Sequence, residues 1–416
     1  MRKELIFSIL RKLLIAGLLV SAVLLTLRTD FYTGTERVLP AADGTGKETE
    51  RVSSADAAAA LRPRAVLVRY ADGTAAASAY DGETTEQAFL RFSAFLGEAL
   101  GSAGTPAEIT ETEFRDGLSG GGVFVDLGGS FPLELLSAWM GAGGGGAAAL
   151  RADLLYLGLT ETGVELRFRD GAGFFRCATG AQSESLRGRI EDFQATEAAF
   201  AFEKPLPEGA EPYTVLLETM PPVYAVSAVS ARDAADPEKL MAAVGMNSYL
   251  ASSYLDADGT EVLMEETRSL RLAPDGTASY RGSGSEREIA SDEFSEAVSY
   301  AYRLVQRSAG AFCGDAEILL REVEGANGTV TVRFDYCVNG IPVRLTEGAA
   351  AEVVISGGIL RRAVLRLRRY TVSEQAETML PMLLSAAVAA ADGGRAPSLV
   401  YMDGGDRVQP IWVNES

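Results

Sequence analysis

The sequence VTVRFDYCVNGIPVRL fills residues 330–345 and indicates the fold more clearly than any other stretch of the chain. Apolar side chains stand at every second position from Val330 to Val338, which is the pattern of a strand with one buried face. Asn339-Gly340 follows, and this dipeptide favours a hairpin because both residues tolerate a positive φ. Residues 341–345 supply a partner strand, so the stretch predicts an antiparallel hairpin.

Two further hairpins flank this one. Their turns are Asp275-Gly276 and Gly357-Gly358, and strand-like residues stand on both sides of each turn. A helical pattern follows each hairpin, over 292–306 and over 373–391. We expect the second helix to break near Pro381, because proline removes a helical hydrogen bond.

The repeat of hairpin and helix predicts the class α+β, in which antiparallel sheets are packed against helices. The length of 416 residues is enough for two or three domains. The expected divisions are a cytoplasmic tail and membrane anchor (1–28), a stalk (29–62), a first exported α+β domain (63–232), a second exported lobe (233–310) and a C-terminal lobe (311–416).

The first domain is expected to begin with a strand over 65–70 and a long amphipathic helix. Thr84-x-x-Gln87 has the form of a capping box at the start of that helix. Apolar residues then recur at helical spacing: Phe89, Phe92, Leu96 and Leu100. Strands near 213–218 and 224–230 are expected to complete the domain.

The first 28 residues have the pattern of an N-terminal membrane anchor. A basic tail precedes the uncharged run Leu13–Leu27, and Arg28 ends it. The excess of basic residues places the tail in the cytoplasm and the bulk of the chain outside. A cleaved signal peptide is the alternative, although no Ala-x-Ala-like site follows the run. Both interpretations export the remaining chain.

Gly17 and Ser21 lie one helical turn apart within this run. Small residues at that spacing let two membrane helices approach closely, so this pair is a candidate packing site for a partner helix. The alternative is that both are small residues facing lipid.

Composition excludes several kinds of chemistry. The chain has no histidine, which removes Ser-His-Asp and Cys-His nucleophiles and any metal site that needs an imidazole. Its net charge of −19 makes nucleic acid a poor partner. The glycine run 141–146 follows a helical pattern rather than a strand, so we expect a loop and not a dinucleotide site. We therefore expect no cofactor.

Two features could carry a metal or a disulfide, and each has a simpler interpretation. Asp256-Ala-Asp258-Gly259 resembles part of a calcium loop, but a plain turn explains it better. Cys313 and Cys337 could form a disulfide outside the cell, or they and Cys177 could stay as thiols. No metal site is expected.

A basic stripe lies at 361–369 in this acidic chain. Arg366 and Arg368 alternate with Leu365 and Leu367, so they would share the outward face of a strand and could bind an acidic partner. The alternative is that they pair with acidic residues of the chain itself or are solvated.

Residues 245–282, residues 330–343 and the ending Pro410-Ile-Trp412 resemble the YycH/YycI family. Its members are single-pass membrane proteins that regulate an essential cell-wall sensor kinase. The resemblance covers roughly 237–416 and the anchor, whereas 63–230 resembles the additional domain of YycH only by position and size. The matching residues, all interpreted as fold positions, are Asn247, Tyr249, Gly340, Pro342, Tyr370, Pro410 and Trp412.

The resemblance implies no enzymatic activity and no catalytic residues. It implies that the chain is a single-pass, membrane-anchored, extracytoplasmic protein that modulates a two-component sensor kinase. Its partners would be the membrane sensor histidine kinase, the lipid bilayer and, as a further candidate, a sister YycH/YycI-like protein. An anchored cell-envelope scaffold or binding protein without a kinase link is the alternative function, and a carboxylate-based hydrolase is a third.

Overall fold

A computed structural model describes residues 60–161, 163–206, 210–284, 289, 294–391, 396–405 and 407–415. All of them lie in one compact unit of the chain, Glu50–Ser416. The expected anchor (1–28) and residues 29–59 of the expected stalk lie outside the described residues. Among the helices that the structure describes, none is long and apolar enough to span a bilayer.

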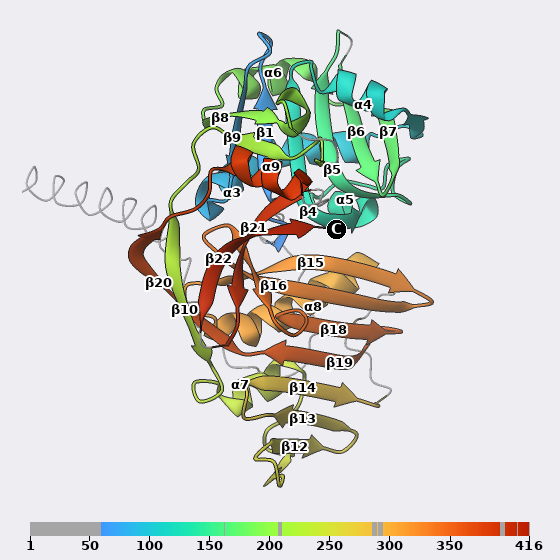
Figure 1. The fold of residues 1–416 in the computed structure, drawn as a ribbon. Coiled ribbons are helices and arrows are strands. Elements are labelled where there is room, and N and C mark those ends of the chain that lie inside the picture. The colour runs from blue at the N-terminus through green and yellow to red at the C-terminus, as the bar shows by residue number, and fades with distance from the viewer. Residues whose placement is uncertain are drawn as a thin grey trace, which may run out of the picture. The chain divides into compact units, whose positions relative to one another are not determined.

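The first half of the described chain forms a nine-stranded sheet in which all neighbouring strands are antiparallel (Figure 1). Across the sheet the strands are β3 (Ala107–Ile109), β7 (Gly173–Ala178), β6 (Val164–Asp170), β5 (Arg151–Leu159), β4 (Gly122–Pro132), β1 (Ala65–Arg69), β2 (Ala75–Ala79), β8 (Thr196–Phe200) and β9 (Val215–Leu217). The helices of this half are α3 (Gly82–Gly101), α4 (Glu111–Gly117), α5 (Leu133–Trp139), α6 (Ser183–Glu191) and the short η1 (Ala201–Glu203).

Helix α3 is the long amphipathic helix that the sequence predicts. Its stripe of Phe89, Phe92, Leu96 and Leu100 is buried, with at most 3% of each residue exposed. The predicted capping box is wrong, because the helix begins earlier: Asp81 is the N-cap and accepts a hydrogen bond from the Thr84 amide at 2.9 Å. The Thr84 hydroxyl instead lies 2.7 Å from that of Ser78 in β2.

The second half is built on an eleven-stranded sheet. Its strands are, in order, β11 (Ser252–Leu255), β12 (Glu261–Glu265), β13 (Arg268–Leu272), β14 (Thr277–Gly282), β19 (Ile359–Arg366), β18 (Ala351–Ser356), β16 (Thr329–Val338), β17 (Ile341–Leu345), β21 (Ala396–Asp403) and β22 (Val408–Glu415), with β15 (Glu317–Ala326) paired to β16. β17 and β21 are parallel, and the other pairs are antiparallel.

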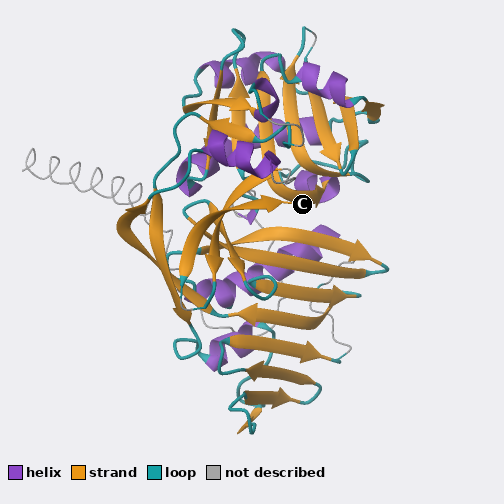
Figure 2. Ribbon diagram, in the orientation of Figure 1, coloured by secondary structure: helices purple, strands orange, loops and turns teal. Residues whose placement is uncertain are grey.

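Helices cover this second sheet. They are α7 (Pro237–Ala243), α8 (Phe294–Arg307), η2 (Ala309–Phe312) and α9 (Met382–Ala391). α8 lies against β15, β16 and β18 (Figure 2). Its face Ala297, Val298, Ala301, Leu304 and Val305 is buried, as the sequence predicts.

The three predicted hairpin turns are confirmed. Asn339 and Gly340 have φ values of 50° and 79°, Gly276 has 93°, and Gly357 and Gly358 have 57° and 74°. The hairpin β13–β14 does not stand apart from β18–β19, because β14 pairs with β19 directly. Residues assigned to two lobes from the sequence therefore share one sheet.

A separate two-stranded ribbon joins distant parts of the chain. β10 (Val223–Ser230) pairs with β20 (Arg368–Glu377) (Figure 1). The predictions that 224–230 completes the first domain and that 373–377 is helical are both wrong, because these segments pair as strands. β10 offers a pairing edge to 373–377, and Pro381 ends up just before α9, where its missing amide breaks no helical bond.

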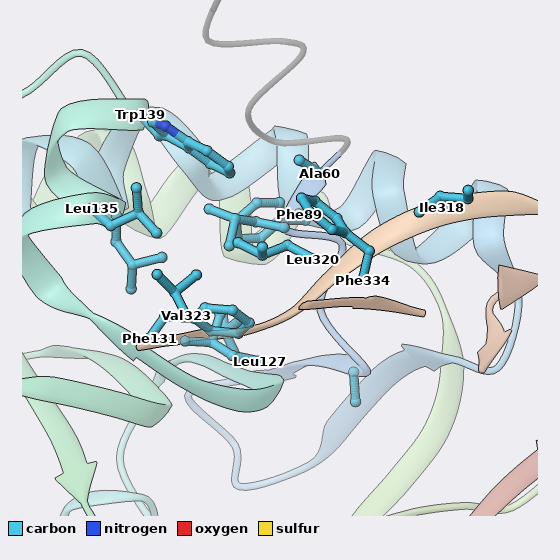
Figure 3. Packing of buried hydrophobic residues seen from close by; sticks show 14 of the residues in the cluster. Ala60, Phe89, Leu127, Phe131, Leu135, Trp139, Ile318, Leu320, Val323 and Phe334 are labelled. Atoms are coloured by element: carbon cyan, nitrogen blue, oxygen red, sulfur yellow. The ribbon is translucent and has the colours of Figure 1, made fainter. Parts of the chain in front are cut away.

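One hydrophobic core runs through both halves. Figure 3 shows Leu127 and Phe131 of β4 and Trp139 of α5 in the same cluster as Leu320 and Val323 of β15. Polar contacts also cross between the halves: the Trp139 indole donates to the Ser299 hydroxyl at 3.0 Å, and Arg151 donates to the Val323 carbonyl at 3.0 Å. The two halves are therefore held together by side-chain packing, not by the chain alone.

The last residues of the expected stalk belong to the fold. Ala60 and Leu61 are buried, at 0% and 3% exposed. Arg62 forms ion pairs with Glu86 of α3, at 2.6 Å, and with Glu317 of β15. The expectation that order starts only after residue 62 is wrong, since the chain meets both halves as it enters the fold.

Candidate partner-binding site

The predicted arginine pair is divided between two strands. Leu367 is 1% exposed and separates Arg366, the last residue of β19, from Arg368, the first of β20. Arg366 donates to the Ala349 carbonyl at 2.7 Å. Arg368 donates to both carboxylate oxygens of Asp403, at 2.9 and 2.8 Å.

Asp403 is the centre of a buried polar network. It is 2% exposed and also accepts a hydrogen bond from the Tyr370 hydroxyl at 2.8 Å. Burial raises the pKa of Tyr370 and the charge of Asp403 raises it further, so the phenol stays protonated. Burial opposes the charge of Arg368, but its bonds to Asp403 outweigh this effect and raise its pKa. Arg368 therefore pairs with an acidic residue of the chain itself, which is the alternative that the sequence left open. Binding of an acidic partner by Arg366 and Arg368 stays a prediction.

All three cysteines are free, buried thiols. Burial raises the pKa of Cys177 and Cys313 to about 11 and that of Cys337 to about 12. The Cys313 thiol donates to the Ala316 carbonyl at 2.8 Å. Cys313 and Cys337 therefore form no disulfide in the structure. Because their thiols stay protonated at neutral pH, they are poor nucleophiles.

The calcium-like fragment is a turn between β11 and β12. Gly259 has φ = +82°, and the Asp258 carboxylate accepts the Thr260 amide at 2.9 Å, which lowers the pKa of Asp258. Asp256 pairs with Arg271 at 3.0 Å. Within the described residues there is no cluster of three or more potential metal ligands.

The glycine run 141–146 forms a loop, as expected, with a packing role. The Gly146 amide donates to the Ala103 carbonyl at 2.8 Å. A Cβ on Gly145 would stand 2.1 Å from the Leu100 carbonyl oxygen, so no larger residue fits beside the end of α3.

Most of the large apolar side chains exposed on the described residues fall into two groups. The first, which we call the edge patch, comprises Tyr249, Leu250, Tyr254, Leu255 and Met264, around β11. The second, which we call the α9 face, comprises Leu380, Leu383, Leu384 and Val388. Exposed groups of this kind mark interaction surfaces on proteins.

Both surfaces lie outside the sites proposed from the sequence. Tyr249, interpreted there as a fold position, is 96% exposed, so that interpretation is wrong. The α9 face adjoins a cavity of about 630 Å³ lined by Leu216, Met220 and Met379 among others. The sequence carries no signal for the edge patch, because its apolar residues have the pattern of buried strand residues.

Comparison with known proteins identifies the architecture. The crystal structure of YycH from Bacillus subtilis matches with a TM-score of 0.57, over 85% of this chain and 93% of that chain, at 10% identity. The fold is that of YycH. No family model matches the chain, and no curated protein does.

The likeness to YycH extends beyond the segment that suggested it. Residues 237–416 make up less than half of the chain, so a match over 85% of it must include much of the first domain. The resemblance predicted from the second half is thus confirmed at the level of the fold. The first domain, similar to YycH only by position and size in sequence, shares the architecture as well.

Proposed function

We propose that this chain is a single-pass, membrane-anchored regulatory protein that modulates a cell-envelope two-component sensor kinase. The observation that carries the proposal is the YycH fold, which spans most of both chains. The function that the YycH/YycI resemblance implies is regulatory and non-catalytic. The protonated thiols and the missing histidine are consistent with this role.

The anchor supplies the membrane half of the proposed mechanism. Leu13–Leu27 would cross the bilayer with the basic tail in the cytoplasm. Gly17 and Ser21 would let a kinase membrane helix approach closely. The exported bulk would then be tethered beside the extracytoplasmic part of the same kinase.

The ectodomain supplies a rigid body for that anchor to carry. Arg62 ties the start of the fold to α3 and β15 at once, and the core continues from one half to the other. A displacement at the start of the fold is therefore passed to both halves rather than absorbed between them. Coupling of about 1–3 kcal/mol, which is typical of allosteric systems, would suffice to shift a kinase between states.

Co-purification tests the proposal. The full chain, solubilised from its own membranes, should retain a sensor histidine kinase in stoichiometric amount. Gly17→Leu should reduce that yield, whereas Ala22→Leu, a change of similar size on another face of the helix, should not.

An eluate without a sensor kinase would instead favour the alternative, an anchored cell-envelope scaffold or binding protein. The edge patch and the α9 face support that alternative equally well, since both are exposed apolar groups that do not specify a partner.

A further inference from the structure

Among the strands that the structure describes, β11 ends the second sheet with one side unpaired. Within the described residues its neighbour is β12 alone, with Tyr254 opposite Val262 and Leu255 opposite Glu261. A free strand edge exposes backbone amides and carbonyls that can pair with another chain. The strand is only four residues long, but its sequence SSYL has no lysine and no proline, two residues that block pairing at a sheet edge.

The ladder fixes which backbone groups face outward. The Asp256 amide donates to the Thr260 carbonyl at 2.8 Å, which makes this pair a hydrogen-bonded one. Hydrogen-bonded and non-bonded pairs alternate along an antiparallel ladder. Ser252 and Tyr254 therefore bond to β12, and the amide and carbonyl of Ser253 and of Leu255 point to the free edge.

The side chains along this edge are apolar and exposed on both faces of the sheet. Tyr254 is 51% exposed and shares its face with Met264, which is 40% exposed. Leu255, on the opposite face, is 71% exposed. Side chains on both faces of an added strand would therefore cover exposed apolar residues of this sheet.

A rigid turn extends the same surface. The Asn247 amide donates to the Glu265 carboxylate at 3.0 Å, and the Asn247 side-chain oxygen accepts the Tyr249 amide at 3.0 Å. The turn so fixed presents Tyr249 and Leu250, which are 96% and 69% exposed. The backbone that carries these side chains is fixed before binding, which lowers the entropy that binding costs.

Charge around the edge is acidic. Residues 240–267 contain five acidic residues and no lysine or arginine. Asp256 and Glu261 pair with Arg271 and Arg232. The others are Asp258, Glu265 and Glu266, and none of them forms an ion pair with a described residue. Arg268 lies opposite Glu265 in the ladder and donates to the Gly245 carbonyl at 2.6 Å, so its charge offsets part of this acidity. Over residues 236–272 seven acidic residues still face only three basic ones.

We propose that β11 accepts an added strand from a partner protein, supplied by an extended segment with consecutive apolar residues flanked by lysine or arginine. The open backbone edge and the edge patch select an extended apolar segment, and the acidic surroundings select basic flanks. A second copy of this chain would bring the same acidic surroundings against themselves. The inference is independent of the kinase link.

The test uses the full chain in detergent and the synthetic peptide KRVIVTVRK. Hydrogen exchange should show the amides of Ser253 and Leu255 unprotected in the free protein and protected in the presence of peptide. The peptide EEVIVTVEE, with the same centre, should bind roughly tenfold more weakly because like charges oppose it.

Three variants separate the edge from the rest of the surface. Ser253→Pro removes only an outward amide, so the fold and the pairing to β12 should persist while peptide affinity falls roughly tenfold. Leu255→Lys should also weaken binding. Leu384→Lys, a matched change on the α9 face, should leave it unaltered.

Specific outcomes would overturn the proposal. One is the absence of saturable binding of KRVIVTVRK up to about 1 mM. Another is an unchanged affinity for Ser253→Pro whose thermal transition matches that of the parent. A third is concentration-dependent protection of Ser253 and Leu255 without peptide, which would assign the edge to a second copy.

Discussion

Asp403 shows how much at the residue scale depends on a single buried charge. Its carboxylate accepts hydrogen bonds from Arg368 and Tyr370, which both lie in β20, and from the Gly405 amide at 2.9 Å. The sequence separates Asp403 from both partners by more than thirty positions, so the pattern of the arginine stripe predicts an outward-facing strand instead. What it could not reveal is that the stripe crosses from one strand to another at the buried Leu367.

Asp403→Asn should destabilise the fold by about 3 kcal/mol, because it leaves Arg368 without its counter-charge in a buried site. Urea unfolding of the full chain measures this. Glu324→Gln, which removes a 57%-exposed partner of Arg333, should cost less than about 0.5 kcal/mol. Equal losses for the two variants would show that the network does not stabilise the fold.

The thiols give a prediction for alkaline pH. Folding raises the pKa of Cys177 and Cys313 from 9.0 to about 11 and that of Cys337 to about 12. Above about pH 9 the unfolded chain therefore binds fewer protons than the folded one, so the free energy of unfolding should fall as pH rises. Replacing Cys337 by serine should flatten that decline between pH 9 and 11, measured by urea unfolding. If Cys337→Ser left the pH dependence of the unfolding free energy unaltered, the raised pKa of Cys337 would be contradicted.

At the element scale, the sequence predicts the turns and the buried face of α3, which local conformation decides, but it misplaces the cap of that helix. The turns at Asn339-Gly340 and Gly357-Gly358 depend on residues that adopt a positive φ, and the buried face of α3 depends on apolar residues at helical spacing. Both signals lie within a few residues of the feature they predict. The helix predicted over 373–377 is wrong because this segment pairs with β10, which lies about 150 positions away along the chain. The β14–β19 pairing and the exposure of the edge patch are equally non-local, so periodicity could not predict them.

The N-cap of α3 is Asp81 in the structure, whereas the sequence pattern predicts a capping box at Thr84 and Gln87. Asp81→Ala should destabilise the fold by about 1 kcal/mol, since it removes the acceptor for the Thr84 amide. Gln87→Ala should have almost no effect, although the sequence pattern gave Gln87 a capping role. Thermal unfolding of both variants checks this, and a larger loss for Gln87→Ala would restore the capping-box interpretation.

At the scale of the whole molecule, the continuous core makes the described chain a single cooperative unit. Both tryptophans lie where the two halves meet: Trp139 ends α5 beside Ser299 of α8, and Trp412 of β22 lies against Tyr80, which follows β2. Each can be followed alone after the other is replaced by phenylalanine. Their unfolding transitions in urea should coincide, and two separated midpoints would contradict a shared core.

Phosphorylation of the co-purified sensor kinase in membrane vesicles tests the central claim most directly. Vesicles containing the full chain should show a changed rate of kinase autophosphorylation relative to vesicles without it. A chain whose residues 1–28 are replaced by an unrelated membrane helix should lose much of that change, because the anchor positions the ectodomain. A rate that is the same with the full chain, with the exchanged anchor and with no chain would contradict the account.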